Sequence, residues 1–296
     1  MFKIIFLTIL SLCLSVFSSD IPLFSFSIFS DNTGDGNDRR EFVTMTEWIK
    51  SNGENYVIGM GDHVKKGTQN KFIEFLASNE WWQRNFYPAI ADNDNEFYGK
   101  DQSDWGAGKA LFDLIDIKSR SNVKFSGSGA DYYAVLTNKG INVHFISLHY
   151  PDKPNDDSLC FRKSSREFMM KTLKRIKKNK TDIIILGAHS RLGYWLDVLN
   201  SEEKELVDQK ADLVLSATTH VFNIYSGNGS DGPLVINTGS ITRPRLWSTP
   251  GFVSVQVLDK PLRIDVSYID CSKEKPSRPL MFSRVIKYIN GKSTVY

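Results

Sequence analysis

The chain has 296 residues, of which 41% are hydrophobic, 12% aromatic and 24% charged, so it is long enough and apolar enough to bury a large core. Its 37 basic and 34 acidic residues give a formal net charge of only +3, which gives no reason to expect binding to nucleic acid or to an anionic membrane. The sequence has no G-x-S-x-G, Walker or H-E-x-x-H motif, which argues against serine esterases, P-loop nucleotide hydrolases and zincin proteases.

The first 18 residues have the pattern of a secretory signal peptide. Lys3 supplies the basic start, residues 4–16 are mostly apolar, and Ser18 is a small residue before the expected cut. The apolar run is short for a membrane span, and no stop-transfer pattern follows, so we favour cleavage over an uncleaved N-terminal anchor. We therefore expect an exported protein (secreted, periplasmic or in the lumen of the secretory pathway) with no integral membrane span after signal removal.

The mature chain would retain two cysteines. Cys13 would leave with the signal peptide, whereas Cys160 and Cys271 would remain. In an exported protein these two could form one disulfide, or they could be two buried free thiols. The sequence leaves both alternatives open.

Short strand patterns alternate with helical patterns along the rest of the chain. Strands are predicted at residues 22–30, 56–60, 86–90, 132–137, 141–148, 183–186, 213–215, 222–225, 234–237, 252–258 and 262–269. Helices are predicted at residues 41–50, 72–82, 164–178 and 201–207, and Asn200 and Glu203 have the spacing of a capping box for the last of these. Because the two kinds of element are interleaved throughout, we predict a single α/β domain over residues 19–296.

Five polar clusters each follow one of the predicted strands. They lie at residues 30–34, 61–63, 91–94, 187–189 and 217–220. In open α/β sheets the loops beyond the carboxyl ends of the strands converge on one crevice, so we expect the side chains of these clusters to meet. Each cluster taken alone would pass for helix caps and turn residues. Converging carboxylates would repel one another without a cation, so the set favours a metal site.

The order of these clusters resembles the calcineurin-like metallophosphoesterases. That family has D-x-H, then G-D, then G-N-H-[DE], then an isolated histidine, then G-H-x-H. This chain has Asp31, Gly61-Asp62, the segment P-A-I-A-D-N-D at 88–94, His189 and His220 in the same order, followed by N-T-G-S-I-T-R-P-R at 237–245. The resemblance covers about residues 22–268 and leaves residues 271–296 as a C-terminal extension. It implies a four-layer αββα sandwich of two mixed β-sheets flanked by helices.

The chain departs from the family pattern at four positions. Thr33 and Thr218 replace two histidines, and a hydroxyl is a poor ligand for a transition metal. Asp92 stands in place of the metal-binding asparagine, and Asn93 in place of the catalytic histidine. Some exported relatives have G-D-N-E here, so the third motif resembles an alternative form of the site.

The resemblance implies two divalent metal ions. Asp62 would bridge them; Asp31 and His220 would complete one set of ligands, and Asp92 and His189 the other. Three carboxylates and two imidazoles form an oxygen-rich set, which favours Mn²⁺ over Mg²⁺, Fe²⁺ or Zn²⁺.

The implied activity is hydrolysis of phosphomonoesters or phosphodiesters by a monomer. Asn93 could donate a hydrogen bond during catalysis but no proton, and a missing general acid costs about 10²–10⁴-fold. His63 could supply the proton or could be an ordinary loop histidine, and Arg191 could hold a substrate phosphate or form a loop salt bridge. The alternative is a catalytically impaired pseudo-phosphoesterase that acts as a binding or scaffold protein.

Two further patterns have both a functional and a structural interpretation. The aromatic residues around Trp81 and Trp82 could wall a pocket for a ring, although core packing is favoured. The basic residues between 174 and 180 could bind phosphate, although the solvated face of a helix is favoured.

Overall fold

The structure is a computed structural model, and it describes residues 21–32, 40–64, 71–91, 94, 106–127, 130–149, 163–190, 199–226, 232–242, 244, 248–289 and 292–295. The predicted leader lies outside these residues. So do five residues singled out in the sequence, namely Thr33, Asp92, Asn93, Cys160 and Arg191. Across the described part of the chain, no helix combines the length and apolarity needed to cross a membrane.

The first of two mixed sheets has seven strands in the order β14-β13-β12-β11-β1-β2-β3. The strands are β1 (Phe24–Phe29), β2 (Tyr56–Gly59), β3 (Phe86–Pro88), β11 (Gly251–Leu258), β12 (Arg263–Asp270), β13 (Leu280–Ile289) and β14 (Lys292–Val295). Strands β1, β2 and β3 run parallel, whereas β11 pairs with β1 in the antiparallel sense.

The second sheet also has seven strands, in the order β4-β5-β6-β7-β8-β10-β9. They are β4 (Val123–Phe125), β5 (Tyr132–Asn138), β6 (Ile141–Leu148), β7 (Asp182–Ala188), β8 (Leu213–Ser216), β9 (Phe222–Ser226) and β10 (Leu234–Thr238). β6, β7, β8 and β10 are parallel to one another, and the outer strands are antiparallel to their neighbours.

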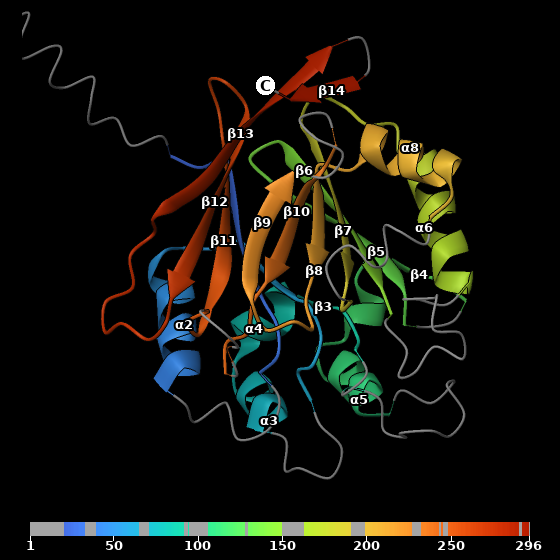
Figure 1. Ribbon diagram of the computed structural model, residues 1–296. Helices are drawn as coiled ribbons and strands as arrows, with labels where there is room; N and C mark the ends of the chain where they lie inside the picture. Colours follow the sequence, from blue (N-terminus) through green and yellow to red (C-terminus); the bar gives the residue numbers. More distant parts are fainter. Residues whose placement is uncertain are drawn as a thin grey trace, which may run out of the picture.

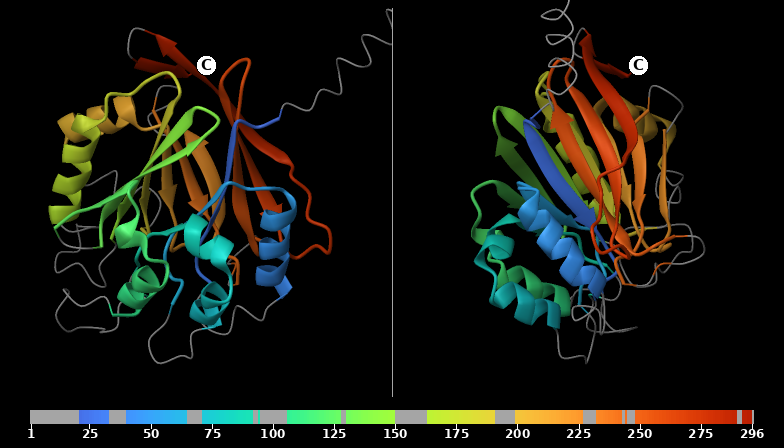
Figure 2. Two further views of the ribbon diagram at one scale, coloured as in Figure 1. Left: turned by 180° about the vertical axis from the view of Figure 1, so that it is seen from behind. Right: turned by 90° about the vertical axis from the view of Figure 1, so that its left-hand side faces the viewer.

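Helices cover the outside of this pair of sheets (Figure 1). Those nearer the first sheet are α2 (Arg40–Ser51), α3 (Lys71–Ala77) and α4 (Glu80–Asn85), and those on the second are α6 (Lys163–Arg175) and α8 (Ser201–Lys210). Helix α5 (Gly106–Leu114) lies beside α3, and its Phe112 packs against Phe125 of β4 and Tyr132 of β5. Figure 2 shows α6 and α8 lying side by side against the second sheet. The arrangement is the αββα sandwich that the sequence predicted.

Two apolar clusters fill the spaces between the layers. The larger contains residues of both sheets, such as Ile28 of β1 and Phe145 of β6, together with residues of α2 to α5. The smaller lies between the second sheet and helices α6 and α8. All six residues of β1 and all seven of β7 are buried, as expected for central strands covered on both faces.

The helix predicted over residues 72–82 is two helices in the structure. The break falls at Asn79, whose side chain accepts a hydrogen bond from the backbone N–H of Trp82 at 3.4 Å and so caps α4. Asparagine competes for backbone hydrogen bonds and favours helix starts over helix interiors, which explains the break. The capping box of α8, with Asn200 and Glu203, is confirmed.

Four elements had no counterpart in the sequence prediction: α5, β4, β14 and the short 3₁₀ helix η2 (Ile117–Ser119). The C-terminal extension supplies β13, which pairs with β12 and widens the first sheet. Cys271 is buried and is a free thiol.

Candidate metal centre

Two carboxylates and one imidazole converge where the strands of the two sheets end. Asp31 follows β1, Asp62 follows β2, and His189 follows β7. All three side chains are buried, and each offers one ligand atom within 4.8 Å of the others. The structure therefore brings together three of the five predicted metal ligands in one group.

His220, which follows β8, joins this group at its more open side. Its Nε2 lies 2.9 Å from Oδ1 of Asp31, and its side chain is 15% exposed. The Nε2 of His189 lies 3.9 Å from the same oxygen and 3.5 Å from Oδ2 of Asp62. The sequence assigned Asp31 and His189 to two ions bridged by Asp62, and the structure places all three residues in one group.

The ring of His189 has a defined orientation. Its Nδ1 lies 2.6 Å from the backbone carbonyl oxygen of Met60. Because a carbonyl oxygen can only accept a hydrogen bond, Nδ1 carries the proton, and Nε2 presents a lone pair to the two carboxylates. A histidine that ligates a metal through one nitrogen commonly donates its other N–H in this way.

The carboxylate of Asp31 has one satisfied and one unsatisfied oxygen. Oδ2 accepts a hydrogen bond from Ser30 Oγ at 2.5 Å, whereas the buried Oδ1 accepts none from the described residues. The contact of 2.9 Å between Oδ1 and His220 Nε2 thus lacks hydrogen-bond geometry. A buried, unpaired carboxylate oxygen is costly, and a bound cation would remove that cost. The residues present therefore fit a divalent metal ion.

The backbone at the site is held in an uncommon conformation. Four non-glycine residues with positive φ lie here, namely Asp31 (55°), Asp62 (57°), Thr218 (74°) and His220 (58°). Such conformations cost about 1–3 kcal/mol each and cluster at functional sites. Their presence at three of the candidate ligands supports a role for this group beyond folding.

The segment after β10 holds the backbone of Asp31 in place. The hydroxyls of Ser240 and Thr242 both donate to the carbonyl oxygen of Asp31, at 3.1 and 2.8 Å. The sequence had marked this segment only as part of the family resemblance. The several hydroxyl residues of this segment could have indicated that it forms hydrogen bonds to the backbone of a neighbouring loop.

Asp94 organises the loop that carries Asp62. Its two carboxylate oxygens accept hydrogen bonds from the backbone N–H groups of Asp62, His63, Val64 and Ala91, at 2.9–3.0 Å. Burial, and then the neighbouring charge of Asp62, raise the pKa of Asp94 to about 7. Sequence reasoning concentrated on the two preceding residues and did not assign this role.

His63 is buried, and both of its ring nitrogens are engaged. Nδ1 lies 2.6 Å from Oδ1 of Asn32, and Nε2 accepts a hydrogen bond from the N–H of Gly61 at 3.1 Å. Burial lowers the pKa of His63 to about 3, so the ring is neutral near pH 7. These contacts tie together the loops after β1 and β2.

Thr218 also contacts the site through its hydroxyl. Its Oγ1 donates to the carbonyl oxygen of His189 at 3.3 Å, so this side chain supports the loop that carries His189. The remaining predicted site residues, Asp92, Asn93 and Arg191, lie outside the described residues.

No protein-family model matches the sequence, and no curated protein is similar to it. Solved structures do match in fold. The phosphoesterase YfcE from E. coli has 12% identity and a TM-score of 0.41, with 88% of this chain and 100% of that chain covered. Vacuolar protein sorting 29 from Cryptosporidium parvum has 13% identity and a TM-score of 0.43, with 88% and 97% covered. The sulfate thiohydrolase SoxB from Thermus thermophilus has 11% identity and a TM-score of 0.48, with 87% and 58% covered.

Proposed function

We propose that this chain, which has the fold of the calcineurin-like metallophosphoesterases, is an exported metal-dependent hydrolase of phosphomonoesters or phosphodiesters. The observation that carries the proposal is the buried group of Asp31, Asp62 and His189, whose ligand atoms all lie within 4.8 Å of one another. The unsatisfied Oδ1 of Asp31 gives this group a specific need for a cation. Export rests on the leader pattern of the sequence.

Asp31, Asp62 and His189 would hold one divalent cation, with His220 beside it. Asp92 would contribute to a second ion, as the sequence resemblance implies. The oxygen-rich set of ligands favours Mn²⁺. When bound, such ions supply charge stabilisation for a phosphoryl group and lower the pKa of a bound water.

The protein itself contributes position and charge. Asp31 and Asp62 place negative charge in a buried site, where it attracts a cation more strongly than it would at the surface. The bond from His189 to Met60 fixes which nitrogen faces the site. In this proposal Asn93 donates a hydrogen bond to the leaving oxygen and Arg191 holds a phosphate oxygen.

A second candidate is a metal-binding protein without turnover. It is favoured by two polar side chains at the site whose hydrogen-bonding atoms are occupied by neighbouring groups of the protein. The hydroxyl of Thr218 donates a hydrogen bond to the carbonyl oxygen of His189. The two ring nitrogens of His63 contact Oδ1 of Asn32 and the N–H of Gly61. In these contacts neither side chain is positioned to protonate a leaving group.

The test measures metal binding and turnover in the same preparation. The chain from Ser19 onward is titrated with Mn²⁺ by calorimetry and assayed on p-nitrophenyl phosphate and its bis-ester. We expect tight Mn²⁺ binding and turnover in the wild type. Asp62→Asn removes a ligand, so it should weaken Mn²⁺ binding by more than about 100-fold. Loss of a residue that only orients a ligand costs about 10–100-fold. The matched control is Asp113→Asn, which removes an exposed carboxylate of α5.

The outcomes separate the two candidates. Turnover that is lost in Asp62→Asn and kept in Asp113→Asn supports the hydrolase. Mn²⁺ binding without turnover above that of Asp62→Asn supports the second candidate. Absence of Mn²⁺ binding by the wild type contradicts both.

A further inference from the structure

A cavity lies on the outer side of the second sheet, away from the metal centre. It has a volume of about 600 Å³ and is bordered by β4, β5, β6 and the C-terminal part of α6. None of the described residues that line it belongs to the metal centre. Its volume is within the about 300–1,000 Å³ that is typical of small-molecule sites.

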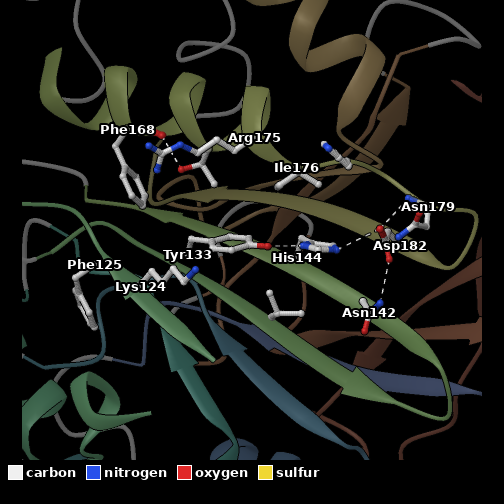
Figure 3. Close-up of a pocket in the computed structure, with 13 residues that line it drawn as sticks. Lys124, Phe125, Tyr133, Asn142, His144, Phe168, Arg175, Ile176, Asn179 and Asp182 are labelled. Carbon is white, nitrogen blue, oxygen red and sulfur yellow. Dashed lines mark hydrogen bonds and ion pairs between the residues drawn. The ribbon is translucent and has the colours of Figure 1, made fainter. Parts of the chain in front are cut away.

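A chain of polar side chains crosses the floor of this cavity (Figure 3). The hydroxyl of Tyr133 lies 2.6 Å from Nδ1 of His144, and Nε2 of His144 lies 3.6 Å from Oδ2 of Asp182. Asp182 in turn accepts hydrogen bonds from Asn142 Nδ2 at 3.0 Å and from the N–H of Asn179 at 2.8 Å. Asp182 is therefore held in place on both of its oxygens.

The charge of Asp182 favours one hydrogen-bond polarity for the Tyr133 hydroxyl, although Oδ2 of Asp182 is too far from Nε2 of His144 for a hydrogen bond. A carboxylate next to Nε2 favours the tautomer of His144 that carries its proton on Nε2. Nδ1 then accepts the proton of the Tyr133 hydroxyl. The oxygen of Tyr133, on a half-buried side chain that lines the cavity, is left as a hydrogen-bond acceptor.

The rim of the cavity is positively charged. Lys124 of β4, Arg175 at the end of α6 and Lys177 just beyond it are all exposed and all line the cavity. Among the described residues that line the cavity, the only carboxylate is Asp182, which is 3% exposed and already accepts hydrogen bonds on both oxygens. Part of the basic run that the sequence attributed to a solvated helix face is thus directed at a cavity.

One wall of the cavity is apolar. Figure 3 shows Phe125 and Phe168 on one side, with Asp182 and Asn142 on the other and Tyr133 and His144 between them. A ligand that uses all of these features needs an apolar ring, a negative charge and a hydrogen-bond donor.

We propose that this cavity binds a small aromatic organic anion, with its ring against Phe125 and Phe168 and its charge among Lys124, Arg175 and Lys177. A hydroxyl on the ring would donate to the oxygen of Tyr133. The inference does not depend on the proposed hydrolase activity, because the two sites share none of the residues that the structure describes.

The first test uses the fluorescent aromatic anion 8-anilinonaphthalene-1-sulfonate. We expect one molecule to bind per folded chain. The double variant Lys124→Gln/Arg175→Gln should weaken binding at least about fivefold, since two charge contacts are lost. Lys171→Gln removes an exposed charge from the same helix without lining the cavity, and it should bind like the wild type. Far-UV circular dichroism checks that each variant is folded.

A competition experiment tests the hydroxyl contact. In the wild type, 4-hydroxybenzoate should displace the probe at least about twofold more effectively than benzoate, and Tyr133→Phe should remove this difference. Asp62→Asn should leave both results unchanged. Equal probe binding by the double variant and the wild type, or an unchanged preference in Tyr133→Phe, would overturn the inference.

Discussion

Glu54 illustrates how one buried side chain couples this fold to pH. It lies between α2 and β2, and its Oε1 accepts hydrogen bonds from Ser254 Oγ at 2.9 Å and from Arg278 at 2.6 Å. Its Oε2 is buried without a hydrogen-bond partner among the described residues. Burial raises the pKa of Glu54 from 4.5 to about 7, because desolvation outweighs the attraction of Arg278.

A raised pKa in the folded state means that folding favours the protonated carboxyl. The stability contributed by Glu54 is therefore fully present below pH 4.5 and is lost as the pH rises through about 7. Glu54→Gln cannot ionise, so the free energy of unfolding of this variant should depend less on pH between these limits. Over this pH range, the change in the free energy of unfolding should be roughly 1–3 kcal/mol smaller in the variant than in the wild type. Urea unfolding at several pH values measures this. Glu47→Gln, at an exposed position of α2, is the control. Parallel pH profiles for Glu54→Gln and the wild type would contradict this account.

At the scale of elements, the loops after the strands carry the site, and a glycine determines how closely two of them approach. Gly61 follows β2 and has a φ of 90°. A Cβ atom at this position would lie 2.5 Å from Cβ of Ala91 and 2.9 Å from Nδ1 of His189. Gly61 thus allows His189 to reach the carbonyl oxygen of Met60, and that contact aims Nε2 at the carboxylates.

Gly61→Ala should therefore damage the metal centre as well as the fold. We expect the free energy of unfolding to fall by about 2–4 kcal/mol, because the backbone is strained and the new methyl group overlaps its neighbours. Mn²⁺ affinity should fall at least about tenfold as His189 is displaced. Calorimetry and urea unfolding measure the two effects.

The matched control for this variant is Gly140→Ala in the turn between β5 and β6. Gly140 has a similar φ of 80°, but a Cβ atom there meets nothing within 4 Å. It should show the backbone strain alone, about 1–2 kcal/mol, with unchanged Mn²⁺ affinity. Equal Mn²⁺ affinities for the two variants would refute the proposed role of the contact between His189 and Met60 in metal binding.

At the scale of the whole molecule, the two sheets share one apolar core. Phe145 of β6 is fully buried in the same cluster as Ile28 of β1, which belongs to the other sheet. The metal centre takes Asp31 and Asp62 from the first sheet and His189 from the second. Stability of the core and integrity of the site should therefore be lost together.

Phe145→Ala should lower the free energy of unfolding by about 3–5 kcal/mol, because it removes a buried ring and leaves a cavity. Unfolding should remain a single transition in which far-UV and near-UV circular dichroism coincide. Val43→Ala, at a position that is 44% exposed on α2, should change stability by less than about 0.5 kcal/mol. Two separate transitions for Phe145→Ala would show that the sheets unfold independently.

Much of the architecture could be predicted from local sequence patterns. Apolar strands, interleaved helices and the capping box at Asn200 depend on residues close together in the chain, so their signals are visible without the fold. The same reasoning predicted that the polar clusters after the buried strands meet at one edge of a sheet. The family resemblance then implied which of their residues are metal ligands, among them Asp31, Asp62, His189 and His220. Local reasoning missed α5 and β4, whose sequence patterns are short. It also missed the break at Asn79, because the side chain of this residue caps α4 and so sets where that helix begins.

The sequence by itself determined the class of fold and the set of polar residues at the strand ends. Only the tertiary structure decided how those residues face one another: the proton position on His189 depends on Met60, and the loop of Asp62 depends on Asp94. It also decided that Arg175 and Tyr133 share a cavity. The physical reason is that strand and helix formation follows from neighbouring residues, whereas orientation, burial and charge at a site arise from contacts between residues far apart in the chain.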